Sequence, residues 1–235
     1  MEEVLAVRVG DRGDPFQVWP LFTSAGGWLF GRAVNGEWDS TQIGVATPES
    51  IAALNRLRIL GEADMGILRR SMDRTESIEL FASGRSPFLL TTSDALPRIR
   101  ESGLPFSVSA VPPFTGGKPA IGFTLIHGLA ISNRGSNKLT AHDLFADYLA
   151  RDHVRKAFAR YIDAPVAVRG ITEQDPAIRQ FLTLCEAGVP MPRFPQMHAT
   201  WRVLEEMEVA VVGGTSAEAA VREAAARLAE IFTTE

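Results

Sequence analysis

The sequence has little of what would assign it quickly to a functional class. Cys185 is the only cysteine among the 235 residues, so no disulfide can form within the chain and cysteine usage indicates no compartment. No apolar run approaches the roughly 18 residues that a membrane-spanning helix requires. The formal net charge is −4, from 24 basic and 28 acidic residues. This balance argues against nucleic acid as a partner, because nucleic-acid binders carry a basic face.

Motifs for catalysis and for metal binding are also missing. The histidines are His127, His142, His153 and His198. Their spacing matches neither H-x-x-x-H nor H-E-x-x-H, so we expect no metal ion. The G-G-T-S run at 213–216 lacks the lysine and the spacing of a phosphate loop, and it predicts a helix stop followed by a cap. Cys185 lies on the apolar face of an expected helix, which favours packing over nucleophilic catalysis. We therefore expect no enzyme and no cofactor.

Local patterns predict a chain in which strands and helices are mixed, which indicates an α/β layered fold. Asp14-Pro15, Thr47-Pro48 and Asp175-Pro176 each pair a capping residue with a proline suited to the first helical position. Asn35-Gly36 predicts a hairpin with a type I′ turn. Alternating or apolar β-branched runs predict strands at 4–9, 87–92, 106–111 and 121–131. Further helices are expected at 73–83, 94–101, 140–150 and 152–162, and from about 196 and 215.

The stretch from 190 to 214 offers the best argument for a functional surface. Three prolines between 190 and 195 predict an extended approach to a helix that begins near Gln196. Apolar side chains then recur at three- and four-residue steps, as in a core-facing stripe: Trp201, Leu204, Met207 and Val211. A flat aromatic ring beside a polar group, on a rigid element after a loop, can present a stacking platform to a ligand. Trp201 beside Arg202 fits this description, and it also fits the plain role of the first core anchor of its helix.

Three ordered stretches resemble the maltose-binding proteins, the sugar-capturing subunits of ABC importers. The run MPRFPQMHATW at 191–201 is similar to that family's MPNIPQMxxxW. DPFQVWPLFTSAGGWLFG at 14–31, followed by NGEWD at 35–39, is similar to its EPYxxWPLxxxxGGxxFxxxNGxYD. VPPFTGGKPAIGFTLIHGLAISNRGSNK at 111–138 resembles its LPxxxGxxxxPxxGxxxxxIxxxSxNK. The similarity extends through most of the chain.

The resemblance implies a periplasmic-binding-protein type II lobe, a mixed sheet flanked by helices, with a partial segment of a second lobe. Residues 1–120 and 170–235 would form the C-terminal lobe, and 121–169 would be an excursion into an N-terminal lobe that is otherwise missing from this chain. The helices at 140–150 and 152–162 would then lack their usual partners. Each large side chain left exposed forgoes roughly 1.5–3 kcal/mol of burial. We therefore expect this segment to repack, to pair with a second copy in a swapped homodimer, or to need a separate N-lobe chain.

Sugars present C–H faces that stack on aromatic rings and hydroxyl groups that bond to carboxylates, arginines and amides. By motif match, the resemblance implies that Asp14 accepts hydrogen bonds from sugar hydroxyls and that Phe16 replaces a stacking tyrosine. Trp201 matches a stacking tryptophan directly. Asp14 could equally be a plain helix cap, and Phe16 could be ordinary core packing.

Three further residues complete the ligand-binding set that the resemblance implies. Met191 matches a methionine that lines the pocket, and Arg202 replaces a tyrosine. Asp94 falls, by a looser alignment, where the family often has another tryptophan, although it could equally be a cap. Fewer aromatic and more polar groups suggest a saccharide shorter or more polar than a long malto-oligosaccharide.

The resemblance implies a function as well. The chain would capture a malto-oligosaccharide or a related saccharide for an ABC importer, whose permease would be its second partner, in an extracellular or periplasmic location. Because MEEVLAVRVG is acidic and then strand-like, it is no signal peptide, and we expect the chain to be a fragment. One alternative is a sugar-sensing or protein-interaction module that keeps the lobe without transport. The other is a small α/β hydrolase or transferase, for which no catalytic group is apparent.

Overall fold

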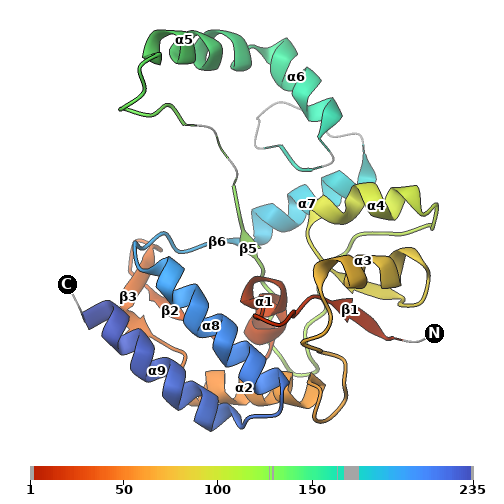
Figure 1. Ribbon diagram of the computed structural model, residues 1–235, viewed down its shortest axis with the longest axis vertical. Helices are drawn as coiled ribbons and strands as arrows, with labels where there is room; N and C mark the ends of the chain where they lie inside the picture. The colour runs from red at the N-terminus through yellow and green to blue at the C-terminus, as the bar shows by residue number, and fades with distance from the viewer. Residues whose placement is uncertain (1–2, 127, 129, 163, 167–174, 234–235) are drawn as a thin grey trace.

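The computed structural model describes residues 3–126, 128, 130–162, 164–166 and 175–233 of a mixed α/β protein (Figure 1). Its helices are α1 (Pro15–Ser24), α2 (Pro48–Leu60), α3 (Arg74–Ala82), α4 (Leu96–Glu101), α5 (Lys138–His142), α6 (Asp152–Tyr161), α7 (Pro176–Ala187), α8 (Met197–Val212) and α9 (Ala217–Thr233). A 3-10 turn, η1 (Ser93–Ala95), precedes α4, and a π-helical segment, η2 (Asp143–Leu149), follows α5. The strands are β1 (Leu5–Val7), β2 (Phe30–Arg32), β3 (Trp38–Ile43), β4 (Phe88–Leu90), β5 (Phe123–Thr124) and β6 (Val189–Pro190).

The strands form three separate two-stranded sheets. β1 pairs with β4 in parallel, β2 with β3 antiparallel, and β5 with β6 in parallel. The expectation of mixed α/β structure, with strands flanked by helices, is therefore confirmed, although the described residues contain no larger sheet. The predicted strand at 106–111 is wrong. Of the one predicted at 121–131, β5 is the only part that forms a strand among the described residues, and residues 127 and 129 lie outside them. Prolines at 105, 112 and 113 bracket the first segment, and each removes a backbone donor that a sheet would use.

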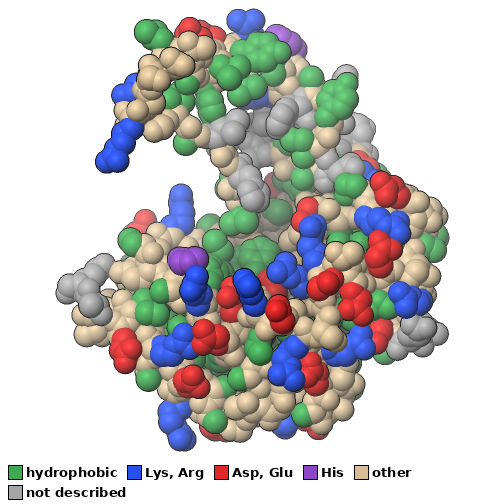
Figure 2. Space-filling view, in the orientation of Figure 1, with side chains coloured by type: hydrophobic (Ala, Val, Ile, Leu, Met, Phe, Trp, Pro, Cys, Tyr) green, Lys and Arg blue, Asp and Glu red, His purple; other side chains and the backbone are tan. Residues whose placement is uncertain are grey.

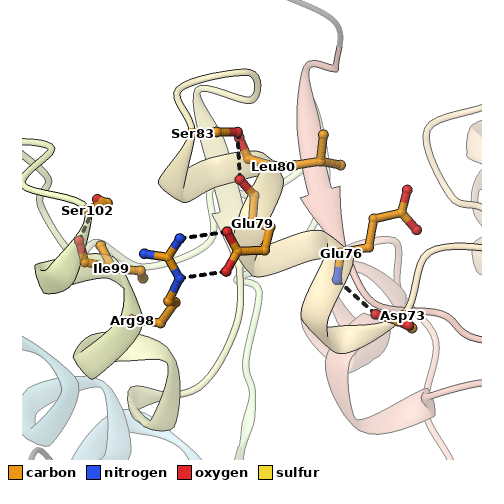
Figure 3. Close-up of polar contacts among 8 residues, drawn as sticks. All are labelled: Asp73, Glu76, Glu79, Leu80, Ser83, Arg98, Ile99 and Ser102. Atoms are coloured by element: carbon orange, nitrogen blue, oxygen red, sulfur yellow. Dashed lines mark hydrogen bonds and ion pairs between the residues drawn. The ribbon is translucent and has the colours of Figure 1, made fainter.

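Several helix starts follow the capping signals, although α4, α5, α6 and α8 begin without a side-chain cap. Asp14, Thr47 and Asp175 each accept a hydrogen bond from a backbone N–H in the first turn of α1, α2 and α7, and a proline follows each of them. Asp73 caps α3 in the same way, with Oδ1 2.8 Å from the Glu76 nitrogen (Figure 3). These predictions are confirmed, because a cap depends on residues that are adjacent in sequence.

The β2–β3 hairpin forms, but with a different turn from the predicted one. Gly36 has a φ of 82°, whereas no residue other than glycine has positive φ among the described residues. A type I′ turn would require positive φ at Asn35 as well. Instead, the Gly36 N–H donates to the Ala33 carbonyl at 2.8 Å and the Ala33 N–H donates to the Glu37 carbonyl at 2.8 Å. The turn therefore uses one left-handed glycine, which is typical of a longer hairpin loop.

The main core lies where α8 packs against α1, α2 and α9. Leu204, Met207 and Val211 of α8 are buried there, as the helical spacing predicts, while Trp201 is only half-buried. A second contact joins α3 to α4, where the Glu79 carboxylate accepts from Arg98 Nε at 2.6 Å and from Nη2 at 2.7 Å (Figure 3). The packing of α8 against α1 in the main core thus fixes the position of these two helices relative to each other.

The segment from α5 to α6 stands apart from the main core in Figure 1. Leu139, Leu144 and Tyr148 on α5 and η2 are exposed. Instead of one regular helix at 140–150, the chain forms five α-helical residues followed by the π-helical η2. Of the helices that the structure describes, none combines the length and apolarity that crossing a bilayer would need.

Candidate functional site

Four aromatic rings surround the ring of Phe123, and we call the five side chains together the aromatic cluster. Trp19 lies closest, with its ring centroid 4.3 Å from that of Phe123 and the rings stacked. Phe16 also stacks, at 6.3 Å. Trp201 and Trp38 meet Phe123 edge-on, at 6.0 and 6.4 Å. These distances fall within or near the range in which aromatic pairs attract one another beyond their burial.

The cluster draws on parts of the chain that are far apart in sequence. Helix α1 contributes Phe16 and Trp19, whose three-residue spacing places them on one helix face. Trp38 comes from β3, Phe123 from β5 and Trp201 from the first turns of α8. Trp19 is 5% exposed, whereas the other four rings are half-buried. Trp19 therefore forms the buried part of the cluster, and we call the partly accessible part, formed by Phe16, Trp38, Phe123 and Trp201, the front of the cluster.

Specific contacts hold Trp38 and Phe123 in place. The Trp38 Nε1–H donates to the carbonyl of Pro190 at 2.7 Å, and the Arg32 guanidinium carbon lies 3.4 Å from the centre of the Trp38 ring system. β5 pairs Phe123 with Val189, so the β6 end lies beside the cluster. Because the indole N–H of Trp38 is already bonded and Arg32 covers one side of the ring, that ring can offer a ligand chiefly its other face.

Of the six predicted site residues, two meet in the cluster. Phe16 and Trp201 both contact the same ring, that of Phe123. Met191 is half-buried directly after β6, next to the carbonyl that holds Trp38. Arg202 is exposed and follows Trp201 on α8. Figure 2 shows a hollow between the α5–α6 segment and the main body, with hydrophobic side chains on its floor and Lys or Arg side chains along its lower edge.

Asp14 serves the fold as well as the candidate site. Its carboxylate caps α1 by accepting from the Gln17 N–H at 3.4 Å, and it lies 3.1 Å from Arg8 Nε. Its side chain is only 14% exposed. Burial raises the pKa of Asp14, and the nearby Arg8 charge and the N–H groups of Gln17 and Phe16 offset this only in part. A sugar hydroxyl would have to compete with Arg8 for this carboxylate.

Asp94 lies outside the cluster in all its described contacts. It belongs to η1, its side chain is 57% exposed, and it pairs with Arg74 and accepts from Thr92 Oγ1. The structure gives no side-chain capping bond for η1. The cap role predicted for Asp94 is therefore wrong, whereas its ligand role stays a prediction.

Three cluster residues were not among the predicted site residues: Trp19, Trp38 and Phe123. Their sequence signal was present, since Trp19 and Trp38 lie inside the quoted stretches at 14–31 and 35–39, and Phe123 lies in the one at 111–138. What the sequence does not give is their convergence on one point. No profile of a known protein family matches the chain. Among the described residues, no three His, Cys, Asp or Glu side chains come together as metal ligands.

Proposed function

We propose that the chain binds a carbohydrate through the front of the aromatic cluster. The observation that carries the proposal is that Phe16 and Trp201, from opposite ends of the sequence, both pack on Phe123 and remain half-buried. Pyranose C–H faces stack on such rings, which favour ligands with one apolar face and polar edges. Together with the resemblance to maltose-binding proteins, this favours the substrate-capturing component of an ABC importer, working outside the cytoplasmic membrane with a permease partner.

The polar groups around the cluster favour a short saccharide. Arg202 offers a forked donor on the exposed side of α8, one position after Trp201 in the sequence. Phe16 provides a ring without a hydroxyl group, and the Asp14 carboxylate is already paired with Arg8. A disaccharide of the maltose or trehalose class would use the two rings and Arg202. A longer malto-oligosaccharide would require further stacking surfaces.

The projecting α5–α6 segment supports a two-lobed arrangement, which we propose in the form that the resemblance implies. Residues 121–169 would belong to the second lobe, and 1–120 with 170–235 to the first. Leu139, Leu144 and Tyr148 would be covered by a separate N-lobe chain or by a second copy of this chain. A saccharide would then be held between the lobes as they close. By itself this chain would bind the saccharide weakly, because half of the contacts would be missing.

Calorimetric titration with maltose, maltotriose and trehalose, with and without an added N-lobe polypeptide, tests this proposal. Trp201→Ala should lower the affinity at least about tenfold, as expected for an aromatic anchor at the centre of a site. Phe88→Ala removes an exposed ring of β4, outside the cluster and outside the 121–169 segment, and should leave the affinity unchanged. Saccharide binding that survives Trp201→Ala would overturn the assignment of the site. Clear preference for maltotriose over both disaccharides would overturn the short-saccharide assignment.

The exposed apolar residues of α5 and η2 favour one alternative, a protein-interaction module without a transport role. In that case a protein partner would bind across Leu139 and Tyr148, and no saccharide would be needed. Leu139→Asp would then abolish the complex while leaving saccharide titrations unaffected. Light scattering of the chain alone and with the candidate partner gives the mass of the complex directly.

A further inference from the structure

A small, partly open cavity lies next to the aromatic cluster, with Trp19 in its lining. Its volume is about 30 Å³, and helices α1, α2 and α8 supply most of its lining. The lining is almost entirely apolar and includes Phe22, Trp28, Leu54 and Met207. Three of the lining side chains, Trp19, Trp28 and Glu208, carry polar groups, and those of Trp19 and Glu208 are buried without a hydrogen-bond partner in the described part of the chain. An apolar cavity of this size would normally hold no water, so the polar groups of Trp19 and Glu208 decide whether water can bind there.

Both polar groups are buried without a protein partner in the described part of the chain. Glu208 is 4% exposed, and neither Oε1 nor Oε2 has a hydrogen-bond partner of ordinary geometry there, although the backbone N–H of Asp14 lies near enough to favour its charged form. Trp19 is 5% exposed, and its Nε1–H is likewise unpaired. Leaving one such group unpaired costs about 1–3 kcal/mol, and a buried carboxylate costs more. Glu208 and Trp19, which we call the two orphan groups, thus place unpaired polar atoms in a core whose other lining side chains are nearly all apolar.

The charges around Glu208 favour its neutral form. Burial raises the pKa of Glu208 well above its ordinary value, and the carboxylates of Asp14 and Glu205 raise it further. The backbone N–H of Asp14 and the Arg8 guanidinium oppose this rise, but Arg8 is engaged by Asp14 at 3.1 Å. A neutral Glu208 carries both an O–H donor and carbonyl acceptor capacity. It can therefore bond with a molecule that itself donates and accepts.

We infer that this cavity is a binding site for one or two water molecules that link the Glu208 carboxyl group to the Trp19 indole. A buried water needs roughly 10–15 Å³ and two or more polar partners, and the cavity offers both. The Trp19 Nε1–H would donate to a water oxygen. The same water, or a second one in contact with it, would exchange hydrogen bonds with Glu208. No other molecule is needed to satisfy both orphan groups.

The position of this site links it to the aromatic cluster. Trp19 is the ring that stacks most closely on Phe123, at 4.3 Å, so a water held at its Nε1 would help fix the orientation of the ring within that cluster. Glu208 would act on the cluster only through the water and Trp19, as a positioning residue. The site would exist whether or not a saccharide binds.

NMR of the whole chain labelled with ¹⁵N-tryptophan tests the inference, first on the wild-type chain and then on two variants. A long-lived bound water should give a direct cross-relaxation signal, with the sign of slow tumbling, between solvent and the Trp19 indole proton. Glu208→Gln keeps a donor and an acceptor and should keep the signal. Glu208→Met fills the cavity with an apolar side chain and should remove it. Absence of the signal in the wild-type chain would overturn the inference, and so would its persistence in Glu208→Met.

A double-mutant cycle supplies the second readout. If a water joins the two groups, Glu208→Met and Trp19→Phe should affect the unfolding equilibrium non-additively, by roughly three- to tenfold in the equilibrium constant. The replacement of Trp19 by Phe should then cost less in the Glu208→Met background than in the wild type. Strictly additive effects would show that the two groups do not communicate and would contradict the shared water.

Discussion

Replacing Phe123 by alanine should destabilise the chain more than its position in a two-residue strand would imply. The ring of Phe123 lies between the rings of Phe16, Trp19, Trp38 and Trp201, at centroid distances of 4.3 to 6.4 Å. Truncation of a fully buried phenylalanine costs about 3–5 kcal/mol. Because Phe123 is half-buried, we expect a loss of about 2–3 kcal/mol in the free energy of unfolding.

Urea unfolding followed by circular dichroism and tryptophan emission measures this loss. Three of the four tryptophans contact Phe123, so Phe123→Ala should also shift the emission of the folded chain to longer wavelength. Phe88→Ala in β4 is the matched control, because that ring is 63% exposed and its removal should cost no more than about 0.5 kcal/mol. Equal losses for the two variants would refute the role given to the Phe123 ring.

Three further predictions concern the core and the helix ends. Since burial raises the native pKa of Glu208, the folded chain keeps a proton that the unfolded chain releases. The free energy of unfolding should therefore fall as pH rises from the ordinary glutamate pKa toward the native one, by up to about 1.4 kcal/mol per pH unit from this group. In urea titrations across pH, Glu208→Gln should flatten this slope and leave a residual slope of the same sign from Asp14. A Glu208→Gln profile parallel to the wild type would contradict this. Asp73→Ala removes the cap of α3 and should cost about 1 kcal/mol, whereas Asp73→Asn should cost much less, as urea midpoints would report. Glu79→Gln breaks an exposed ion pair with Arg98, so any loss of thermal stability should shrink in added salt; a salt-independent loss would argue against a charge effect.

The local features of the fold could be predicted from the sequence, because their causes lie within a few residues. Asp14, Thr47 and Asp175 cap their helices as their Asp-Pro and Thr-Pro pairs indicate. Apart from the β2–β3 hairpin, strand pairing could not be predicted in the same way, since β1–β4 and β5–β6 join partners that lie far apart along the chain. The segment at 106–111 has an alternating pattern yet forms no strand, while the two residues of β5 find a partner 66 positions later.

In the candidate site, too, single residues could be predicted from the sequence, whereas their arrangement in space could not. Phe16 and Trp201 could be named from the quoted stretches, but their meeting at Phe123 depends on how α1, β5 and α8 pack. Glu208 did carry a readable signal: it lies four residues after Leu204 and three before Val211, on the buried stripe of α8. A carboxylate in such a stripe is a polar group that the fold must satisfy. Its neighbours, however, come from α1 and the segment before it.

Titration of the ¹⁵N-tryptophan-labelled chain with maltose or trehalose tests the proposed function most directly. The indole signals report on binding even when the dissociation constant is about 1 mM or weaker, which suits a chain that would supply only part of the contacts. The account predicts that the Trp201 signal moves and saturates, while that of Trp28, which lines the small cavity, stays fixed. If Trp201 does not move at saccharide concentrations up to about 100 mM, or moves no more than Trp28, the aromatic cluster is not a saccharide site.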